Sequence, residues 1–414
     1  MRNKSKAAGG RLAVVLAVVA GLTAGTMAAA GQAAADEMKP IRIGVLTDLG
    51  GVTADATGKG SVEAARLAVE DMGGKVAGRP VEVISADHQH KTDLGSSIAR
   101  EWFDQAGVDV IVDVPNSAVA LAVQEIAREK KKMVLFSGAG TPALTGKSCS
   151  PYGVHWTYDT YALSRGTAGA VVKAGGDSWF MIASDYAFGH QLARDAAAVV
   201  TGAGGQVVGE VFHPLATADF SSYLLQAQAS GAKVVGIANA GGDTINTIKQ
   251  AGEFGLVAGG QKLAALILML SDIHGLGLQA AQGTYLTTPS YWDVDDRARA
   301  LSKRYMERVG AMPGMLQAGV YGEVLHYLKA VDAVGGTDAD AVSAKMRALP
   351  IDDPYSRNAR LREDGRVVRD MYLARVKAPA ESKGPWDYLD IVATIPGDEL
   401  VWPLSESTCP LVAR

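Results

Sequence analysis

The sequence predicts an α/β protein made of two lobes, each a doubly wound parallel sheet. Short β-branched runs alternate with helical patterns along most of the chain, which is typical of parallel sheets covered by helices on both faces. This pattern starts again after the stretch HWTYDTYA, so the strands fall into two groups. A chain of 414 residues is also too long for one small core and suits two lobes of ordinary size.

The first group opens with the buried-strand run IRIGVLTDLG. The helix that follows is SVEAARLAVEDM, in which Val62, Ala65, Val69 and Met72 share one face. The next strands are RPVEVISAD, VDVIVDV and KMVLFSG, and the helices between them are DLGSSIAREWFDQ and SAVALAVQEIAREKK.

The second group repeats this design with four helix–strand pairs. Its helices are ALSRGTAGAVVKAG, GHQLARDAAAVVTGAG, FSSYLLQAQASG and DTINTIKQAGEFGL, and its strands are SWFMIAS, QVVGEVF, KVVGIAN and KLAALIL. A mostly helical part follows GTYLTTPSYWDVD. Near the end, RNARLREDGRVVRDMYLARV predicts two strands joined at Asp364 and Gly365, a strong hairpin signal.

The first 35 residues read as a secretory signal peptide. Four basic residues and no acidic residue precede the apolar run LAVVLAVVAGL, and Ala33 and Ala35 are placed for cleavage before Asp36. The alternative is an uncleaved membrane anchor, but the apolar run is short for a spanning helix. After cleavage, 36 basic and 44 acidic residues remain, a net charge of −8. This charge argues against nucleic acid and anionic membranes as partners.

The chain has two cysteines, Cys149 and Cys409, and both lie beyond the predicted cleavage site. In an exported chain an even count predicts one disulfide. This bond would tie the C-terminal tail to the middle of the chain. We expect Trp386 and Trp402 of that tail to pack on the surface of a lobe.

Motifs for catalysis, metal binding and nucleotide binding are weak in this sequence. In GTPALTGKS, Gly140 lies one residue too far from Gly146 for a phosphate-binding loop. The histidines of DHQH, His88 and His90, are expected to be solvated rather than to hold a metal. No G-x-S-x-G nucleophile turn occurs. We therefore expect no catalytic residue, no metal, no cofactor and no enzymatic activity.

Two loops of the first lobe suit a ligand instead, because ligands of such sheets bind outside the carboxyl ends of the strands. Asn116 and Ser117 open a helix, whose free N–H groups suit a carboxylate. In SGAGT, glycine lets a ligand approach the backbone closely, and Thr141 adds a hydroxyl. The alternative is helix capping and turn chemistry alone.

Several stretches together resemble the substrate-binding proteins of ABC importers of the leucine/isoleucine/valine-binding type. They are IRIGVLTDLGG, SVEAARLAVEDMGG, GRPVEVISAD, VLFSGAGTPALT, SDYAFGHQLARD and IKQAGEFGL, within residues 41–377. The resemblance implies a type I periplasmic binding fold with a three-segment hinge, expected near residues 157–160, 290–291 and 357–366. It also implies a monomer in the periplasm that delivers a small-molecule ligand to an inner-membrane permease and its ATPase. A periplasmic sensor domain of the same fold is a further alternative.

We expect the following organisation of the chain. Residues 1–35 form the signal peptide, residues 36–158 and 289–356 the first lobe, residues 159–288 the second lobe, residues 357–378 closing strands of the second lobe, and residues 379–414 the tail.

The resemblance also implies where the ligand lies. The predicted ligand-binding residues are Asn116, Ser117, Ala139, Gly140, Thr141, Tyr158, Asp185, Tyr186, Phe188, Asn239, Ala240 and Met269. Within SDYAFG, Tyr186 and Phe188 offer flat faces for stacking, while His190 is expected in the solvated first turn of a helix.

The chain departs from the family pattern where the family binds an ammonium group. The family's tyrosines fall near Ala56 and Ala240, and its glutamate falls in the apolar stretch LILMLSD. A buried ammonium needs a carboxylate partner, because an unpaired buried charge is very costly. The sequence therefore favours an aromatic or other apolar carboxylate. Asp185 or Asp243 could restore an ammonium site, which keeps an amino acid or amide as the alternative.

Overall fold

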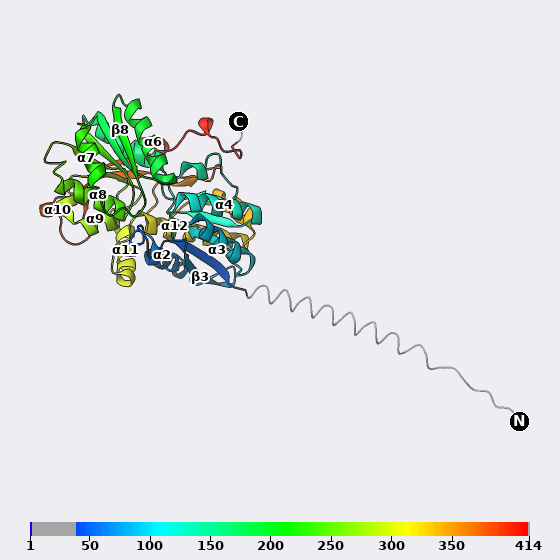
Figure 1. Ribbon diagram of the computed structural model, residues 1–414. Helices are drawn as coiled ribbons and strands as arrows, with labels where there is room; N and C mark the ends of the chain where they lie inside the picture. The colour runs from blue at the N-terminus through cyan, green and yellow to red at the C-terminus, as the bar shows by residue number, and fades with distance from the viewer. Residues whose placement is uncertain (2–38, 413–414) are drawn as a thin grey trace.

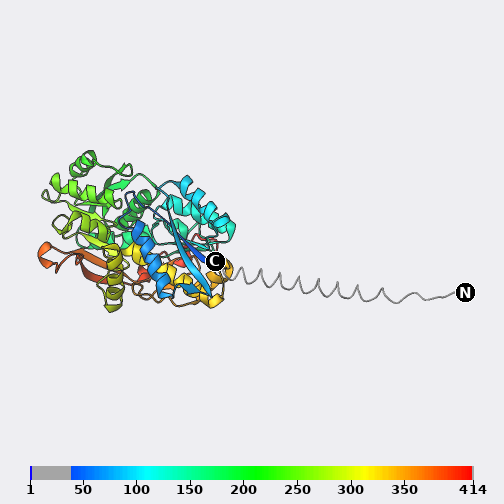
Figure 2. The same cartoon turned by 90° about the horizontal axis from the view of Figure 1, so that it is seen from below.

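The protein consists of two lobes that lie side by side in the computed structural model (Figure 1). The structure describes residue 1 and residues 39–412. Apart from Met1, the predicted signal peptide lies outside the described residues. Within the coloured part of the chain, β8 (Gln206–His213) and α6 (Ala187–Gly202) of lobe 2 lie at the upper left, and β3 (Arg79–Asp87) and α3 (Thr92–Asp104) of lobe 1 at the lower right. Figure 2 shows the same division from below.

Lobe 1 is built on a six-stranded sheet in the order β2-β3-β1-β4-β5-β6. Only β2 and β3 pair antiparallel; the other neighbours are parallel. The strands are β1 (Ile41–Thr47), β2 (Lys75–Val76), β3 (Arg79–Asp87), β4 (Val110–Asp113), β5 (Met133–Phe136) and β6 (Gly153–His155). The helices are α2 (Gly58–Asp71), α3 (Thr92–Asp104), α4 (Ser117–Lys130), α11 (Asp296–Val309), α12 (Met315–Val334) and α13 (Ala339–Ala348).

Both faces of this sheet are buried, and successive residues of a strand pack on opposite faces. Ile43 and Val45 pack in a core with α2, α11, α12 and α13. Leu46 and Ile111 point to the other face and pack with α3 and α4. Successive side chains of a strand point to opposite faces, so the continuous apolar runs predicted from the sequence are doubly buried strands.

Lobe 2 contains a four-stranded parallel sheet in the order β10-β9-β7-β8. Its strands are β7 (Ser178–Ser184), β8 (Gln206–His213), β9 (Val234–Ala238) and β10 (Lys262–Ala265). Its helices are α5 (Thr160–Lys173), α6 (Ala187–Gly202), α7 (Ser221–Ala229), α8 (Gly242–Glu253), α9 (Leu270–Leu276) and α10 (Leu278–Ala281). A three-stranded antiparallel sheet completes the lobe, with β11 (Tyr285–Thr288), β14 (Met371–Val376) and β15 (Leu389–Ile395).

Short 3-10 turns occur at η1 (Pro142–Leu144), η2 (Pro379–Glu381), η3 (Gly397–Glu399) and η4 (Leu404–Glu406).

The predicted hairpin near the end of the chain is present but shorter than expected. Strands β12 (Arg360–Leu361) and β13 (Val367–Val368) pair across the predicted turn, where Gly365 has φ +86°. Val367 packs in the core of lobe 1, whereas Met371 packs in the core of lobe 2. The chain therefore crosses between the lobes after β13, as it also does between β6 and α5 and between β11 and α11.

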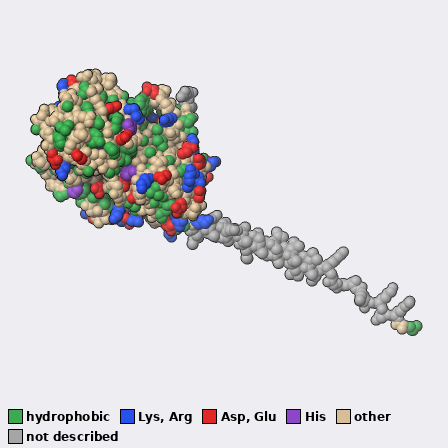
Figure 3. Space-filling model, viewed as in Figure 1, with side chains coloured by type: hydrophobic (Ala, Val, Ile, Leu, Met, Phe, Trp, Pro, Cys, Tyr) green, Lys and Arg blue, Asp and Glu red, His purple; other side chains and the backbone are tan. Residues whose placement is uncertain are grey.

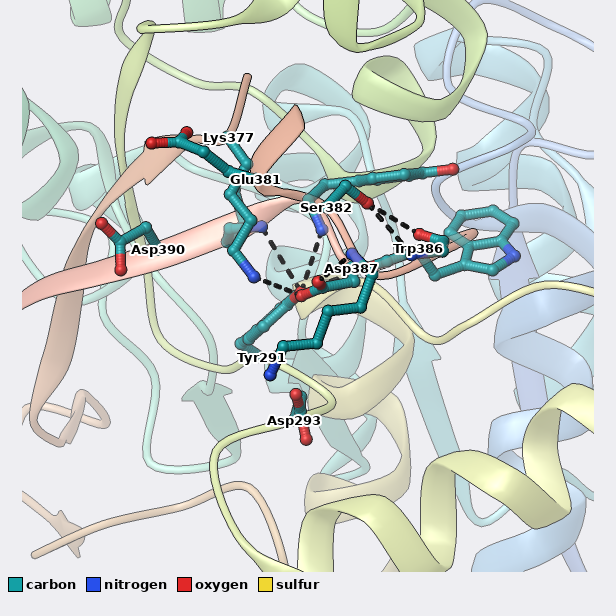
Figure 4. Close-up of polar contacts among 12 residues, drawn as sticks. Tyr291, Asp293, Lys377, Glu381, Ser382, Trp386, Asp387 and Asp390 are labelled. Carbon is teal, nitrogen blue, oxygen red and sulfur yellow. Dashed lines mark hydrogen bonds and ion pairs between the residues drawn. The ribbon is translucent and has the colours of Figure 1, made fainter. Parts of the chain in front are cut away.

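The C-terminal tail is more deeply integrated than the sequence predicts. Strand β15 extends the sheet of β14, and Trp386 is buried rather than on the surface. Figure 4 shows Trp386 among its polar neighbours, which include Tyr291. The Trp386 carbonyl oxygen accepts hydrogen bonds from the Tyr291 hydroxyl (3.1 Å) and from Trp292 Nε1 (2.8 Å). Asp387 beside it pairs with Lys377. Tryptophan at this position therefore belongs to the core of lobe 2.

The last part of the tail connects lobe 2 to lobe 1 a fourth time. Trp402, as expected, lies at the surface, and it stacks on Tyr161 of α5 with ring centroids 4.2 Å apart. The predicted disulfide between Cys149 and Cys409 is confirmed, with a Cα–Cα distance of 5.6 Å. Residues 402–409 thus form a covalently anchored strap between the lobes.

Candidate functional site

A small, narrow cavity lies between the two lobes. It is formed where loops follow the carboxyl ends of parallel strands in both lobes, the usual place for a ligand in such sheets. The lining residues are Thr53, Pro115, Ser117, Gly138, Gly140, Tyr158, Tyr186, Phe188, Ala240, Met269 and Leu316. Seven of the predicted ligand-binding residues are among them.

The lobe 1 side of the cavity is the start of α4. Asn116 caps this helix, because its Oδ1 accepts hydrogen bonds from the N–H groups of Ala118 (3.0 Å) and Val119 (3.1 Å). Ser117 follows as the first helical residue, and its buried Oγ has no hydrogen-bond partner within the described residues. A helix start with a free hydroxyl suits a carboxylate group.

The loop after β5 passes between two aromatic rings. A Cβ atom on Gly140 would lie 2.7 Å from the Phe188 ring and 2.9 Å from the Tyr158 ring, so only glycine fits there. The Tyr158 hydroxyl donates a 2.9 Å hydrogen bond to the Gly138 carbonyl oxygen, which holds the ring against the loop. Burial raises the pKa of the Tyr158 hydroxyl far above its usual value, so this hydroxyl stays a donor.

The lobe 2 side is apolar and aromatic. Tyr186 and Phe188 lie at the start of α6 with ring centroids 6.0 Å apart, and Ala240 and Met269 follow the neighbouring strands. No carboxylate of the described residues lines the cavity. Gly189 lets the chain turn sharply, since a Cβ there would lie 2.1 Å from the Ser184 carbonyl oxygen.

Five predicted residues do not line the cavity. Asn116 and Thr141 act as helix caps, and the Ala139 side chain packs in the core of lobe 1. Asn239 is fully buried behind the site, where it bonds to His213, Thr244 and Thr247. The Asp185 side chain is 61% exposed and pairs with His190 at 2.7 Å.

Asp243 differs from Asp185 in being buried. It is 1% exposed, and its Oδ2 accepts a 3.1 Å hydrogen bond from the Ala216 N–H, while its Oδ1 has no partner within the described residues. Burial raises the pKa of the Asp243 carboxyl to about 6. Of the two acids considered for an ammonium site, only Asp243 is in a low-dielectric position.

Two lining residues had no distinctive sequence signal. Thr53 lies in the first loop, and its hydroxyl donates a 2.7 Å hydrogen bond to the buried Asp48 carboxylate. Leu316 comes from the first turn of α12, far along the chain, and packs with residues of lobe 2. A threonine in a loop and a leucine in a helix are too common to be singled out.

The two histidines of DHQH are not solvated as the sequence predicted. His88 is fully buried, and burial lowers its pKa to about 4. His90 pairs with Asp48, with 2.8 Å between His90 Nε2 and Asp48 Oδ2. Across residues 39–412, the structure brings together no group of three or more His, Cys, Asp or Glu side chains that could hold a metal ion.

The surface gives two further observations. On the face drawn in Figure 3, acidic and basic side chains of the described residues are interspersed rather than gathered by sign. Within those residues, no helix combines the length and the apolar character needed to cross a membrane.

Comparisons with known proteins give consistent matches. The family model described as periplasmic binding protein matches residues 40–385. A solved periplasmic binding protein from Burkholderia mallei is 50% identical, covers 90% of this chain and 99% of its own, and has a TM-score of 0.88. A branched chain amino acid ABC transporter periplasmic ligand-binding protein from Burkholderia xenovorans LB400 is 45% identical, covers 90% of this chain and 100% of its own, and has a TM-score of 0.81. The Leu/Ile/Val-binding protein homolog 6 of Brucella melitensis is 26% identical over 347 residues, 81% of this chain and 87% of the relative.

Proposed function

The chain belongs to the family of periplasmic binding proteins, and we propose that it captures a small aromatic or other apolar carboxylate between its lobes. The ligand would be delivered to an inner-membrane ABC permease and its ATPase. The relative from Burkholderia xenovorans, described as an ABC transporter protein, supports this role.

The observation that carries the choice of ligand is the polarity of the cavity. Its lobe 1 side offers the free Ser117 hydroxyl at a helix start, and its lobe 2 side offers Phe188, Met269 and Ala240 without a carboxylate. One end therefore suits an anion and the other an apolar body. A ligand ammonium placed against Met269 would be desolvated without a partner, which is strongly unfavourable.

The alternative ligand is an amino acid or amide. The buried Asp243 with its unpartnered Oδ1 is the observation that favours it, and the relative from Burkholderia xenovorans carries the description of a branched chain amino acid transporter. Asp243 does not line the cavity, however, so an ammonium group could reach it only if the surrounding loops moved. A role as a periplasmic sensor domain would use the same site and differ only in the partner protein.

A thermal-shift screen of the purified protein tests the ligand class. Because a ligand stabilises the state that binds it, 4-hydroxybenzoate and related aromatic acids should raise the melting temperature and amino acids should not. Ser117→Ala should reduce the shift, since it removes the free hydroxyl. Stabilisation by leucine with no response to any aromatic acid would rule out the preferred ligand class.

We further propose export with removal of residues 1–35 and a monomeric mature protein. N-terminal sequencing of the exported protein should begin at Asp36, and light scattering should give the mass of one chain. An N-terminus at Met1 would contradict the proposed cleavage.

A further inference from the structure

Three polar side chains from separate loops meet behind the lobe 1 side of the cavity. Asp48 follows β1, His90 follows β3 and Asn116 follows β4, so the chain brings them together only through the sheet. His90 Nε2 lies 2.8 Å from Asp48 Oδ2, and His90 Nδ1 lies 3.1 Å from Asn116 Nδ2. Asp48 is fully buried, Asn116 is nearly so, and the His90 side chain is 11% exposed.

The orientation of Asn116 determines which ring nitrogen of a neutral His90 carries the proton. Asn116 Oδ1 accepts two helix N–H groups of α4, which leaves Nδ2, a donor, facing His90. His90 Nδ1 must therefore accept, and the proton of a neutral His90 must lie on Nε2, where it is donated to Asp48. A proton on Nδ1 would set two donors against each other.

The same chain of contacts orients two hydroxyl residues that line the cavity, Thr53 and Ser117. Asp48 Oδ2 accepts hydrogen bonds from the Thr53 hydroxyl (2.7 Å) and the Thr53 N–H (2.9 Å). At the other end, Asn116 fixes the first turn of α4, in which Ser117 carries its free hydroxyl. His90 contacts both Asp48 and Asn116 and so links the Thr53 side of this chain of contacts to the Ser117 side.

The backbone at His90 is held in an unfavourable conformation. Gln89 and His90 have φ of +51° and +55°, the left-handed region that side chains other than glycine rarely adopt. Such strain persists where the surrounding contacts demand it, and it clusters at ligand sites. The His90 N–H donates a 3.0 Å hydrogen bond to His88 Nδ1, which helps to hold the turn.

We propose that His90 is a positioning residue of the binding site, which in its neutral Nε2–H form holds Asn116 as the cap of α4 and so places the Ser117 hydroxyl for the ligand. This proposal rests on the proposed function, and it adds a role for a residue that does not line the cavity. The other titratable groups near His90 are Asp48, the His88 ring at a centroid distance of 5.3 Å, and Asp243 of lobe 2.

Two substitutions of His90 test its contact with Asn116 and its contact with Asp48 separately. His90→Asn can keep an acceptor near the position of Nδ1, facing Asn116, whereas His90→Gln can keep a donor near the position of Nε2, facing Asp48. We expect His90→Gln to weaken binding of 4-hydroxybenzoate about tenfold. His90→Asn, in contrast, should retain most of the wild-type affinity. Equal losses in the two variants would overturn the proposal.

Two readouts need no ligand. Nitrogen-15 spectra of the wild-type imidazole should show an unprotonated Nδ1 and a protonated Nε2. Amide exchange of Ala118 and Val119 should be about tenfold faster in His90→Gln than in His90→Asn. A proton on Nδ1, or unchanged exchange in both variants, would overturn the role of His90. Failure of the wild-type protein to bind any aromatic acid would instead count against the proposed function.

Discussion

The backbone N–H of Gly242 in lobe 2 donates a 3.0 Å hydrogen bond to the carbonyl oxygen of Val52 in lobe 1. This bond joins the two sides of the cleft beside the cavity, so the structure is a closed form. The adjacent Gly241 has φ +58°, and a Cβ atom on it would lie 2.0 Å from the same Val52 oxygen. Closure therefore requires glycine at position 241.

Gly241→Ala should weaken ligand binding because it opposes the closed form. The left-handed backbone and the clash with Val52 should together cost about 1–3 kcal/mol of binding free energy. Calorimetry measures the affinity, and small-angle X-ray scattering with saturating ligand should show a more open particle. The matched control is Gly252→Ala in α8, where a Cβ would meet nothing within 4 Å. Unchanged affinity in Gly241→Ala would contradict the closure role.

Met269→Glu should strongly weaken binding of an apolar acid. It would place a second carboxylate in the same small cavity as the ligand carboxylate. The glutamate charge would then be desolvated without a cation to pair with it. We expect a loss of about 100-fold or more in affinity for 4-hydroxybenzoate, which corresponds to about 3 kcal/mol. Met269→Leu, which conserves volume and polarity, should retain binding. An unaltered affinity in Met269→Glu would mean that Met269 does not face the ligand.

Asp243→Asn distinguishes the two ligand classes and should also change the pH dependence of stability. The folded pKa of Asp243 is raised to about 6, above its usual 3.8. A carboxyl with a raised folded pKa leaves stability unaffected below the unfolded pKa and lowers it as the pH rises through the folded pKa. Asp243→Asn should therefore stabilise the protein by about 1–3 kcal/mol at pH 7 and by almost nothing at pH 3.5.

The ligand affinity of Asp243→Asn distinguishes the two ligand classes. Binding of an aromatic acid should be unchanged in Asp243→Asn, because no ligand cation needs this carboxylate. Urea unfolding at the two pH values and calorimetry at pH 7 provide the measurements. A large loss of affinity would favour the amino acid alternative.

Cys409→Ser should both destabilise the protein and allow wider opening. The disulfide closes a loop with a sequence separation of 260 residues, and such bonds typically contribute about 2–5 kcal/mol. The strap it anchors also links the lobes, so the ligand-free variant should have a larger radius of gyration than the wild type. Reductant should reproduce both effects in the wild type and have none on a variant lacking both cysteines. Two free thiols in the mass spectrum of the intact exported protein would refute the bond.

The sequence predicted the parts of the fold that depend on local pattern. Buried β-branched runs and amphipathic helices located the two sheets, and the strand ends located the loops around Ser117, Gly140 and Phe188. The cysteine pair followed from the even cysteine count in a chain with a predicted signal peptide. Strand β15 was missed because its alternation is weak on a largely exposed strand.

The remaining site features depend on contacts between distant segments. Leu316 reaches the cavity from α12, and the contact of Asp48 with His90 joins loops that only the sheet order brings together. His88 was expected to be solvated, yet it is buried under the same loops. A sequence pattern reports the face of an element, but not which element from elsewhere covers it.

The most direct measurement is a calorimetric titration of the purified mature protein with 4-hydroxybenzoate and, in parallel, with leucine. Saturable binding of one aromatic acid per chain, with no heat of binding from leucine, is the predicted result. Tight binding of leucine with no response to 4-hydroxybenzoate would contradict it.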